Sequence, residues 1–354
     1  MRGTDRHLSI HLAPWARARG HRVEAGNVIV RGDADRRRLT GATRAGHVAQ
    51  VVEQAPATWG LAARGALVEA GAPPLAGVDL DSRTQLWTDL APKLYAQAAA
   101  GQWDPATAID WEPPNLPADV ETAVVQVMTY LIENEQAALM VPARFLGRIH
   151  PHFREITQFL ATQVADEARH VEVFTRRASL VGSELGVSGA GGRASLQTLL
   201  EEPDWATASF LLSALGEGTF LSLLSFLERY APDPVTAQVS RLALQDEARH
   251  VAFALGHLGD HLGRDPGYRD RLRAAAERRH DALASTAGLA PQVHDALVIL
   301  AAGSWSADAI ATGWKRVQAL QAEMDEGRRR RLVRLGFSDS QAADISALHT
   351  RNFM

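Results

Sequence analysis

One six-residue string with metal-binding side chains occurs twice in this sequence of 354 residues. Asp-Glu-Ala-Arg-His-Val begins at Asp166 and again, 80 residues later, at Asp246. Each copy places a glutamate three residues before a histidine, and residues three apart on an α-helix are neighbours on one face. Each copy therefore predicts a Glu-His pair able to bind one metal ion. The pairs are Glu167 with His170 and Glu247 with His250.

A further glutamate precedes each copy at a similar distance. Glu135 stands 32 residues before Glu167, and Glu217 stands 30 residues before Glu247. Glu135 lies in an apolar stripe, whereas Glu133 lies about 200° around the helix and cannot share that face. We therefore expect Glu135 to point inward, with Glu133 as the alternative. Glu217 is the only carboxylate within an otherwise apolar helix face.

Four carboxylates on inward-facing positions are too costly as bare charges, because burying even one unpaired ion costs several kcal/mol. Two divalent ions would balance the four carboxylates, and two neutral imidazoles would complete six ligands. Oxygen ligands with imidazole suit iron or manganese without choosing between them. The sequence has no cysteine, which excludes thiolate-bound zinc and iron–sulfur clusters.

With these motifs, residues 118–262 resemble the ferritin-like superfamily. The closer resemblance is to its oxygen-activating dimetal-carboxylate branch, which includes ribonucleotide reductase small subunits, bacterial multicomponent monooxygenases and acyl-carrier-protein desaturases. The resemblance implies an all-α, ferritin-like four-helix bundle with a dimetal centre of two iron ions, or of Mn/Fe, and O2 as co-substrate. Matched residue by residue, it implies six catalytic metal ligands, which are Glu135, Glu167, His170, Glu217, Glu247 and His250.

The aspartate of each string resembles the outer carboxylate that accepts a hydrogen bond from a ligand histidine in this superfamily. Such a partner sets the tautomer of the histidine and raises its basicity. Arg169 and Arg249 are expected to hold Asp166 and Asp246 by charge-assisted hydrogen bonds. Five side chains near the ligands at helical spacing are our candidates for the pocket wall, although a threonine inside a helix more often bonds to its own backbone. These candidates are Met128, Phe174, Phe210, Thr219 and Leu221.

The ligands must be positioned by long helices, and the sequence predicts four. Turn-forming and helix-breaking residues bound them, including Pro117, Pro142 and the pair Asp233-Pro234, a cap residue followed by proline. The predicted helices cover about 118–140, 153–180, 205–229 and 234–261. A last helix is expected from about Ser338 to Leu348, with Ser338 as its cap. Near the N-terminus, 21–24 and 27–30 predict a small hairpin.

These elements predict four segments along the chain. An N-terminal segment, 1–75, forms a small α+β module. A helix and a connection occupy 76–117, the dimetal bundle occupies 118–262, and C-terminal helices that pack on the bundle occupy 263–354.

Departures from the relatives' patterns narrow the expected chemistry. Ribonucleotide reductase small subunits usually carry a radical tyrosine one turn after the first ligand histidine, where this chain has Phe174. The superfamily's amine N-oxygenases add a histidine one turn before the second Glu-x-x-His, where this chain has Ala243. Rubrerythrins carry an additional iron domain with four cysteines, which a sequence without cysteine cannot form. Ferritins are typically half this length, so iron storage does not account for the remaining residues.

The expected function is that of a non-haem di-iron or Mn/Fe oxidase or oxygenase. Its substrate would be small and organic, or carrier-bound, and its reaction hydroxylation, N-oxidation, desaturation or oxidative cleavage. The alternative is a ferroxidase or metal-handling protein without an organic substrate. Without an iron–sulfur relay, repeated turnover would need an external reductase, a small reductant or electrons from the substrate.

Composition indicates which partners are absent. The formal net charge of −4 leaves no electrostatic footprint for nucleic acid. No continuous apolar run approaches the roughly 18 to 20 residues that cross a bilayer, so no membrane association is expected. The first residues lack the apolar segment of a secretory signal, and we expect a cytoplasmic protein. A homodimer stays an open alternative.

Overall fold

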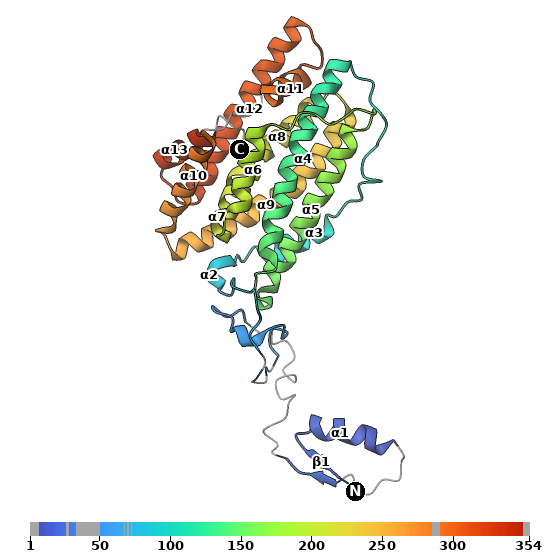
Figure 1. Cartoon of the computed structure of the whole chain (residues 1–354), viewed down its shortest axis with the longest axis vertical. Coiled ribbons are helices and arrows are strands. Elements are labelled where there is room, and N and C mark those ends of the chain that lie inside the picture. Colours follow the sequence, from blue (N-terminus) through green and yellow to red (C-terminus); the bar gives the residue numbers. More distant parts are fainter. Residues whose placement is uncertain are drawn as a thin grey trace. The chain divides into compact units, whose positions relative to one another are not determined.

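Four long helical segments form a bundle in the larger of the chain's two compact units (Figure 1). The computed structural model describes residues 7–25, 28–32, 50–66, 68, 71, 73–284 and 291–349. The smaller unit comprises Met1–Val52 and Pro56–Leu75, and the larger comprises Glu53–Ala55 and Ala76–Met354. The segments predicted separately at 76–117 and 263–354 thus fall in the same unit as the bundle.

The bundle helices follow the chain in two pairs joined by one long connection. The bundle consists of α4 (Ala118–Leu146), α5 (Arg154–Ala178), the segment α7 (Trp205–Ser209) with a π-helix (Phe210–Glu217) and α8 (Gly218–Tyr230), and α9 (Pro234–Arg264). A short 3-10 turn, Pro151–Phe153, lies between α4 and α5, and residues 231–233 join α8 to α9. Residues 179–204 form the long connection and contain α6 (Ala190–Glu201). One long crossover between two helix pairs is typical of ferritin-like bundles.

The predicted helix limits hold for α5 and α9 to within three residues, and α9 has the expected cap. The Asp233 carboxylate accepts a hydrogen bond from the Thr236 backbone N–H at 2.8 Å. The predicted end of α4 near residue 140 is wrong, because the helix continues to Leu146 with Pro142 inside it. Proline removes one backbone hydrogen bond, but Val141, Pro142 and Phe145 are all buried here, so packing outweighs that loss.

The third predicted helix, 205–229, is interrupted by a π-helical stretch that was not predicted from the sequence. Residues Phe210–Glu217 form the wider i→i+5 turns of a π-helix, which occur frequently at functional sites. In these wider turns residues five apart lie nearer to one face than in an α-helix, where they are about 140° apart, and Leu212 and Glu217 line the same pocket. The irregularity therefore changes which side chains accompany Glu217.

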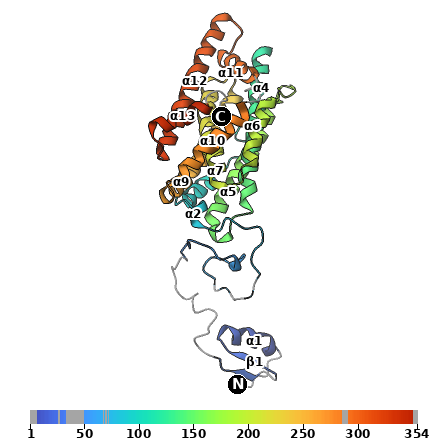
Figure 2. The same ribbon diagram turned by 60° about the vertical axis from the view of Figure 1, so that its left-hand side comes forward.

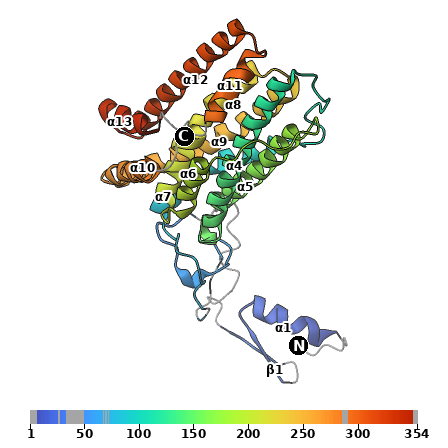
Figure 3. The ribbon, with the colours of Figure 1, turned by 45° about the horizontal axis from the view of Figure 1, so that its top comes forward.

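Six further helices that the structure describes complete the larger unit, besides the bundle helices and α6. They are α2 (Arg83–Leu86), α3 (Ala91–Ala100), α10 (Tyr268–Ala284), α11 (Pro291–Ala302), α12 (Ala307–Arg334) and α13 (Asp339–His349). In Figures 2 and 3, α10, α12 and α13 lie together beside the bundle, while α4 and α5 lie on its other side. Helix α11 packs on α4 and α12, and α12 packs on α8. As predicted, the Ser338 hydroxyl caps α13, accepting from the Gln341 N–H at 3.2 Å.

The smaller unit contains the predicted hairpin. Strands β1 (Arg22–Glu24) and β2 (Val28–Val30) pair antiparallel, with Val23 opposite Ile29. The predicted strand start at Asn27 and the turn residue Gly26 lie outside the described residues. Helix α1 (Leu8–Ala18) packs against β1, and a hydrogen bond of 2.7 Å from His21 N to Ala16 O joins the two elements.

One continuous segment contradicts the expectation that no stretch reaches membrane-spanning length. Trp205–Tyr230 is long and apolar enough to cross a bilayer, with a mean hydropathy of 1.6, and a bent pair made of α11 and α12 passes the same test. Counting uninterrupted apolar runs missed the first segment because glycine, serine and threonine interrupt it. However, 78% of its apolar window is buried inside the fold, as expected for the core helix of a bundle.

Candidate metal centre

All six predicted ligand residues meet at the centre of the bundle. Helix α4 supplies Glu135, α5 supplies Glu167 and His170, the last residue of the π-helix is Glu217, and α9 supplies Glu247 and His250. Each of them is at most 5% exposed. The alternative residue, Glu133, is only half-buried and belongs to neither ligand cluster.

The six side chains form two overlapping clusters, each able to hold one metal ion. One cluster is Glu135, Glu167, His170 and Glu247, and the other is Glu167, Glu217, Glu247 and His250. Within each cluster the potential ligand atoms lie within 4.8 Å of one another. Glu167 and Glu247 belong to both clusters, so each can bridge two ions with its two oxygens.

Both histidines direct their Nδ1 atom toward the glutamates of the two clusters. His170 Nδ1 lies 3.3 Å from Glu135 Oε2 and 3.3 Å from Glu167 Oε2. His250 Nδ1 lies 3.0 Å from Glu167 Oε1 and 3.4 Å from Glu247 Oε2. The Nδ1 atoms are therefore the candidate ligand atoms of both imidazoles.

Polar atoms without partners show that this donor set fits two metal ions. Buried polar groups are nearly always hydrogen-bonded, and each exception needs an explanation. Among the described residues, six ligand atoms in the cluster are buried without a hydrogen bond, and divalent ions would satisfy all of them. The six atoms are Glu135 Oε1, Glu167 Oε1, Glu167 Oε2, Glu217 Oε2, Glu247 Oε2 and His250 Nδ1.

Burial and crowding shift the pKa values of the ligand groups in opposite directions. Burial, with the neighbouring carboxylates, raises the pKa of Glu135 and raises that of Glu217 to about 8. Burial also opposes ionisation of Glu247, but His250 and His170 outweigh it and lower its pKa. Burial likewise disfavours the charged histidines, yet the surrounding carboxylates raise the pKa values of His170 and His250. Without metal, the cluster therefore holds protons that its ligand atoms must release.

Metal binding is accordingly expected to weaken as pH falls below 8. Glu217, with its pKa at about 8, is increasingly protonated below that value, and Mn(II) must displace that proton. Titrations of the metal-free protein with Mn(II) at pH 6, 7 and 8, followed by the spin resonance of free Mn(II), should show about tenfold weaker affinity per pH unit or more. An affinity independent of pH over this range would contradict the assignment of Glu217 as a ligand.

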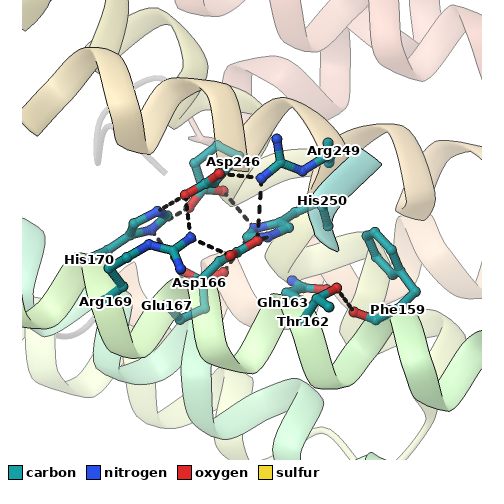
Figure 4. Close-up of polar contacts among 12 residues, drawn as sticks. Phe159, Thr162, Gln163, Asp166, Glu167, Arg169, His170, Asp246, Arg249 and His250 are labelled. Carbon is teal, nitrogen blue, oxygen red and sulfur yellow. Dashed lines mark hydrogen bonds and ion pairs between the residues drawn. The ribbon is translucent and has the colours of Figure 1, made fainter. Parts of the chain in front are cut away.

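The outer aspartates contact the ligand histidines crosswise, as Figure 4 shows. Asp246 Oδ2 lies 3.2 Å from His170 Nε2, and Asp166 Oδ2 lies 3.3 Å from His250 Nε2. Each aspartate thus serves the histidine of the other string. An Nε2–H donated to aspartate leaves Nδ1 unprotonated toward the clusters, which is the tautomer a metal ligand needs.

The two arginines also reach across the helix pair. Arg169 donates to Asp166 and, at 2.9 Å, to Asp246, while Arg249 donates to Asp246 and lies 3.5 Å from Asp166. The sequence predicted that the two arginines hold the two aspartates, and in the structure Arg169 and Arg249 each lie near both of them. Burial opposes the ionisation of both aspartates, but the histidines and their other partners outweigh it and lower both pKa values.

Three polar residues around the site were missed at the sequence level. Trp103 Nε1 donates to Asp246 Oδ2 at 2.9 Å, and Gln102 Nε2 donates to Asp166 Oδ1 at 3.0 Å. Both lie in the segment after α3, where nothing in the sequence indicates a role. Gln163 Nε2 donates to Glu217 Oε1 at 3.3 Å. Its position one turn before Glu167 on the same helix face was the available signal.

A mostly apolar pocket opens beside the clusters. Its lining comes from α4, α6, the π-helix, α8, α9 and α10, and includes three of the ligand glutamates. The lining residues are Asn134, Glu135, Ala138, Leu196, Leu199, Leu211, Leu212, Gly216, Glu217, Phe220, Glu247 and Arg279.

None of the five predicted pocket residues lines this cavity. Met128 and Phe210 are fully buried in the core, and Leu221 is half-buried away from the pocket. Thr219 donates to the Leu215 carbonyl at 2.7 Å, the backbone bond named above as the common case. Phe174 does adjoin the site, with its ring 6.3 Å from that of His170, but it is not in the pocket lining. From the π-helix, Leu211, Leu212 and Gly216 line the cavity in place of the predicted Phe210.

Comparisons with known proteins return a likeness of structure only. No protein-family model matches the sequence, and no curated protein matches it. One similar solved structure is a variant of R2-like ligand-binding oxidase with an aerobically reconstituted Mn/Fe cofactor. It is 21% identical, with 72% of this chain and 95% of that chain covered and a TM-score of 0.47. Another variant, with an Fe/Fe cofactor, is also 21% identical, with coverages of 72% and 94% and a TM-score of 0.48.

The bundle itself assigns the fold class. A glutamate from each of two helices and a Glu-x-x-His pair from each of the other two, all directed inward, characterise ferritin-like dimetal bundles. Helix α4 and the π-helix between α7 and α8 supply the single glutamates here, and α5 and α9 supply the pairs. The larger unit of this chain is therefore a ferritin-like helical bundle with a candidate dimetal centre.

Proposed function

We propose that the protein is a non-haem dimetal oxidase or oxygenase that uses O2 to oxidise a small organic or carrier-bound substrate. The observation that carries the proposal is the sharing of Glu167 and Glu247 by both ligand clusters. Two shared carboxylates favour two ions at one centre over two independent sites. The metals would be two irons or a manganese and an iron, because the donors are oxygen and imidazole alone.

When bound, such a metal pair supplies the redox chemistry with which O2 is reduced. The protein contributes the arrangement of the ligands. Asp166 and Asp246 orient the imidazoles through their Nε2 atoms, and Gln163 holds one oxygen of Glu217. The apolar part of the pocket excludes water from the place where a substrate would meet the centre. Whether the reaction is hydroxylation, N-oxidation, desaturation or cleavage depends on the substrate.

The pocket favours an organic substrate over the alternative of a ferroxidase. A ferroxidase needs the six ligands and a path for iron, but not an apolar cavity against three of the ligand glutamates. Electrons for repeated turnover would come from an external reductase, a small reductant or the substrate.

Loading the metal-free protein anaerobically with Fe(II) and then admitting O2 tests the proposal. We expect two irons per chain, rapid O2 uptake and a change in near-ultraviolet and visible absorbance. After the two bound irons are oxidised, uptake should stop unless a reductant is added. Continued oxidation of further Fe(II) would instead indicate a ferroxidase. Less than one iron per chain, or O2 uptake no faster than that of free Fe(II), would contradict a dimetal oxidase.

A further inference from the structure

A buried arginine lines the pocket beside the candidate metal centre. Arg279 belongs to α10, outside the four bundle helices, and is only 5% exposed. It lines the same cavity as the ligand glutamates Glu135, Glu217 and Glu247. The cavity therefore has positive charge on one part of its wall and metal-binding carboxylates on another.

The hydrogen-bond partners of Arg279 are all neutral. Its Nε donates to Thr198 Oγ1 at 3.0 Å, and its NH2 donates to Ser195 Oγ at 2.8 Å and to the Ser195 carbonyl at 3.4 Å. Both partners lie on α6, so these bonds fix the guanidinium in place. Its remaining nitrogen, NH1, donates to none of the described residues.

Two other deeply buried arginines in the described chain have acidic partners, whereas Arg328, like Arg279, donates only to hydroxyl groups. Arg177 is paired with Glu121 and Asp233, and Arg169 with Asp166 and Asp246. Arg279 has no carboxylate within ion-pair distance among the described residues. Burial lowers its pKa to about 10, and the phenol of Tyr130 partly opposes this shift. A buried cation without a counter-charge is costly, and a bound anion would remove that cost.

The rest of the pocket constrains what the anion can be attached to. Most of its other lining is apolar, including Leu196, Leu199, Leu211 and Phe220. The glutamates would repel an anionic group, whereas Arg279 would attract it. An acid with an apolar body therefore has one favoured orientation, with its charge on Arg279 and its apolar part toward the centre.

We propose that Arg279 binds the carboxylate of a small organic acid with an apolar body and thereby orients the substrate toward the metal-ligand glutamates. Guanidinium and carboxylate match in geometry, and their charge-assisted bonds are stronger than neutral ones. This inference rests on the proposed function for the identity of the reacting centre. It adds the chemical class of the substrate and the residue that selects it.

The test uses the Mn(II)-loaded protein, in which no oxidation interferes, with benzoate and benzamide as probes of equal size and different charge. Ligand-observed nuclear magnetic resonance titrations give the dissociation constants. We expect benzoate to bind at least tenfold more tightly than benzamide. Arg279→Gln should weaken benzoate binding about 10- to 100-fold and leave benzamide unchanged. Arg279→Lys, which keeps a cation, should retain part of the preference.

Arg278→Gln is the matched control, because Arg278 is the exposed neighbour on the same helix and should leave both affinities unchanged. Manganese content per chain is measured in every variant and reports whether the bundle has folded. Equal affinities for the two probes, no binding of either, or an unchanged benzoate affinity in Arg279→Gln would overturn the proposal. The last result would mean that benzoate binds the metals directly.

The two proposals fail in different ways. If the wild-type protein loads metal and consumes O2 but Arg279→Gln binds benzoate normally, the inference about Arg279 fails and the dimetal function stands. If the protein binds no metal while metal-free protein still prefers benzoate through Arg279, the dimetal function fails and the anion site stands.

Discussion

Replacing Glu167 and Glu247 together by alanine should reduce bound metal to background. Each of these glutamates belongs to both clusters, so the double variant lowers the protein ligands of each cluster from four to two. One cluster would keep Glu135 and His170, and the other Glu217 and His250. Two ligands from the protein do not form the three- or four-ligand sites that hold transition metals in proteins. Metal per chain, measured by mass spectrometry after loading and desalting, gives the result.

Two single variants serve as references for this measurement. Glu133→Ala should retain the wild-type metal content, because its half-buried side chain belongs to neither cluster. Glu135→Ala should weaken one cluster and leave the other with four ligands. Wild-type metal content in the double variant would refute the ligand assignment. Loss of metal in Glu133→Ala with retention in Glu135→Ala would reverse the choice between these neighbours.

Removing the charge of Arg177 should destabilise the bundle by about 3 to 5 kcal/mol. This arginine is fully buried and holds three helices together. It donates to Glu121 of α4 at 2.7 and 2.9 Å, to Asp233 at 2.9 Å and to Thr236 of α9 at 2.8 Å. Arg177→Met would fill much of the space and leave two buried carboxylates without a cation. Asp233 is also the cap of α9, so the start of that helix would be affected as well.

Urea unfolding of the metal-free protein, followed by circular dichroism, measures this loss. Arg176→Met is the matched control, since Arg176 is exposed and stacks on Trp111 at 4.1 Å. Its loss should cost about 1 kcal/mol or less. Because burial of unpaired carboxylates causes the predicted loss, adding Glu121→Gln to Arg177→Met should recover part of it. Equal effects of the two arginine variants would contradict a central role for the buried network.

The cluster of candidate ligands could be predicted from the sequence because its geometry is local. Residues three apart share a helix face whatever surrounds the helix, so the two Glu-His pairs follow from spacing alone. The apolar stripe around Glu135 separated it from Glu133 for the same reason. The caps at Asp233 and Ser338 are local too, since each side chain bonds to a backbone N–H three residues later.

The pocket could not be predicted in the same way. Its wall was assigned on regular α-helical spacing, and the π-helix Phe210–Glu217 breaks that spacing. A π-turn gives up regular α-helical hydrogen bonding in return for packing elsewhere, and no residue type marks its position reliably. The predicted end of α4 near Pro142 was wrong for a related reason. Burial of the surrounding residues outweighed the tendency of proline to end a helix.

Local periodicity was thus sufficient to predict four helical segments and six inward-facing candidate ligands, all of them carboxylate or imidazole. Contacts between distant segments settled everything around that centre. Asp166 and Asp246 each contact the histidine of the other string because α5 and α9 pack together. Trp103 donates to Asp246 although the two are 143 residues apart, and Arg279 lines the pocket from α10. Such partners depend on how helices pack against one another, and this packing cannot be derived from the spacing of residues within a single helix.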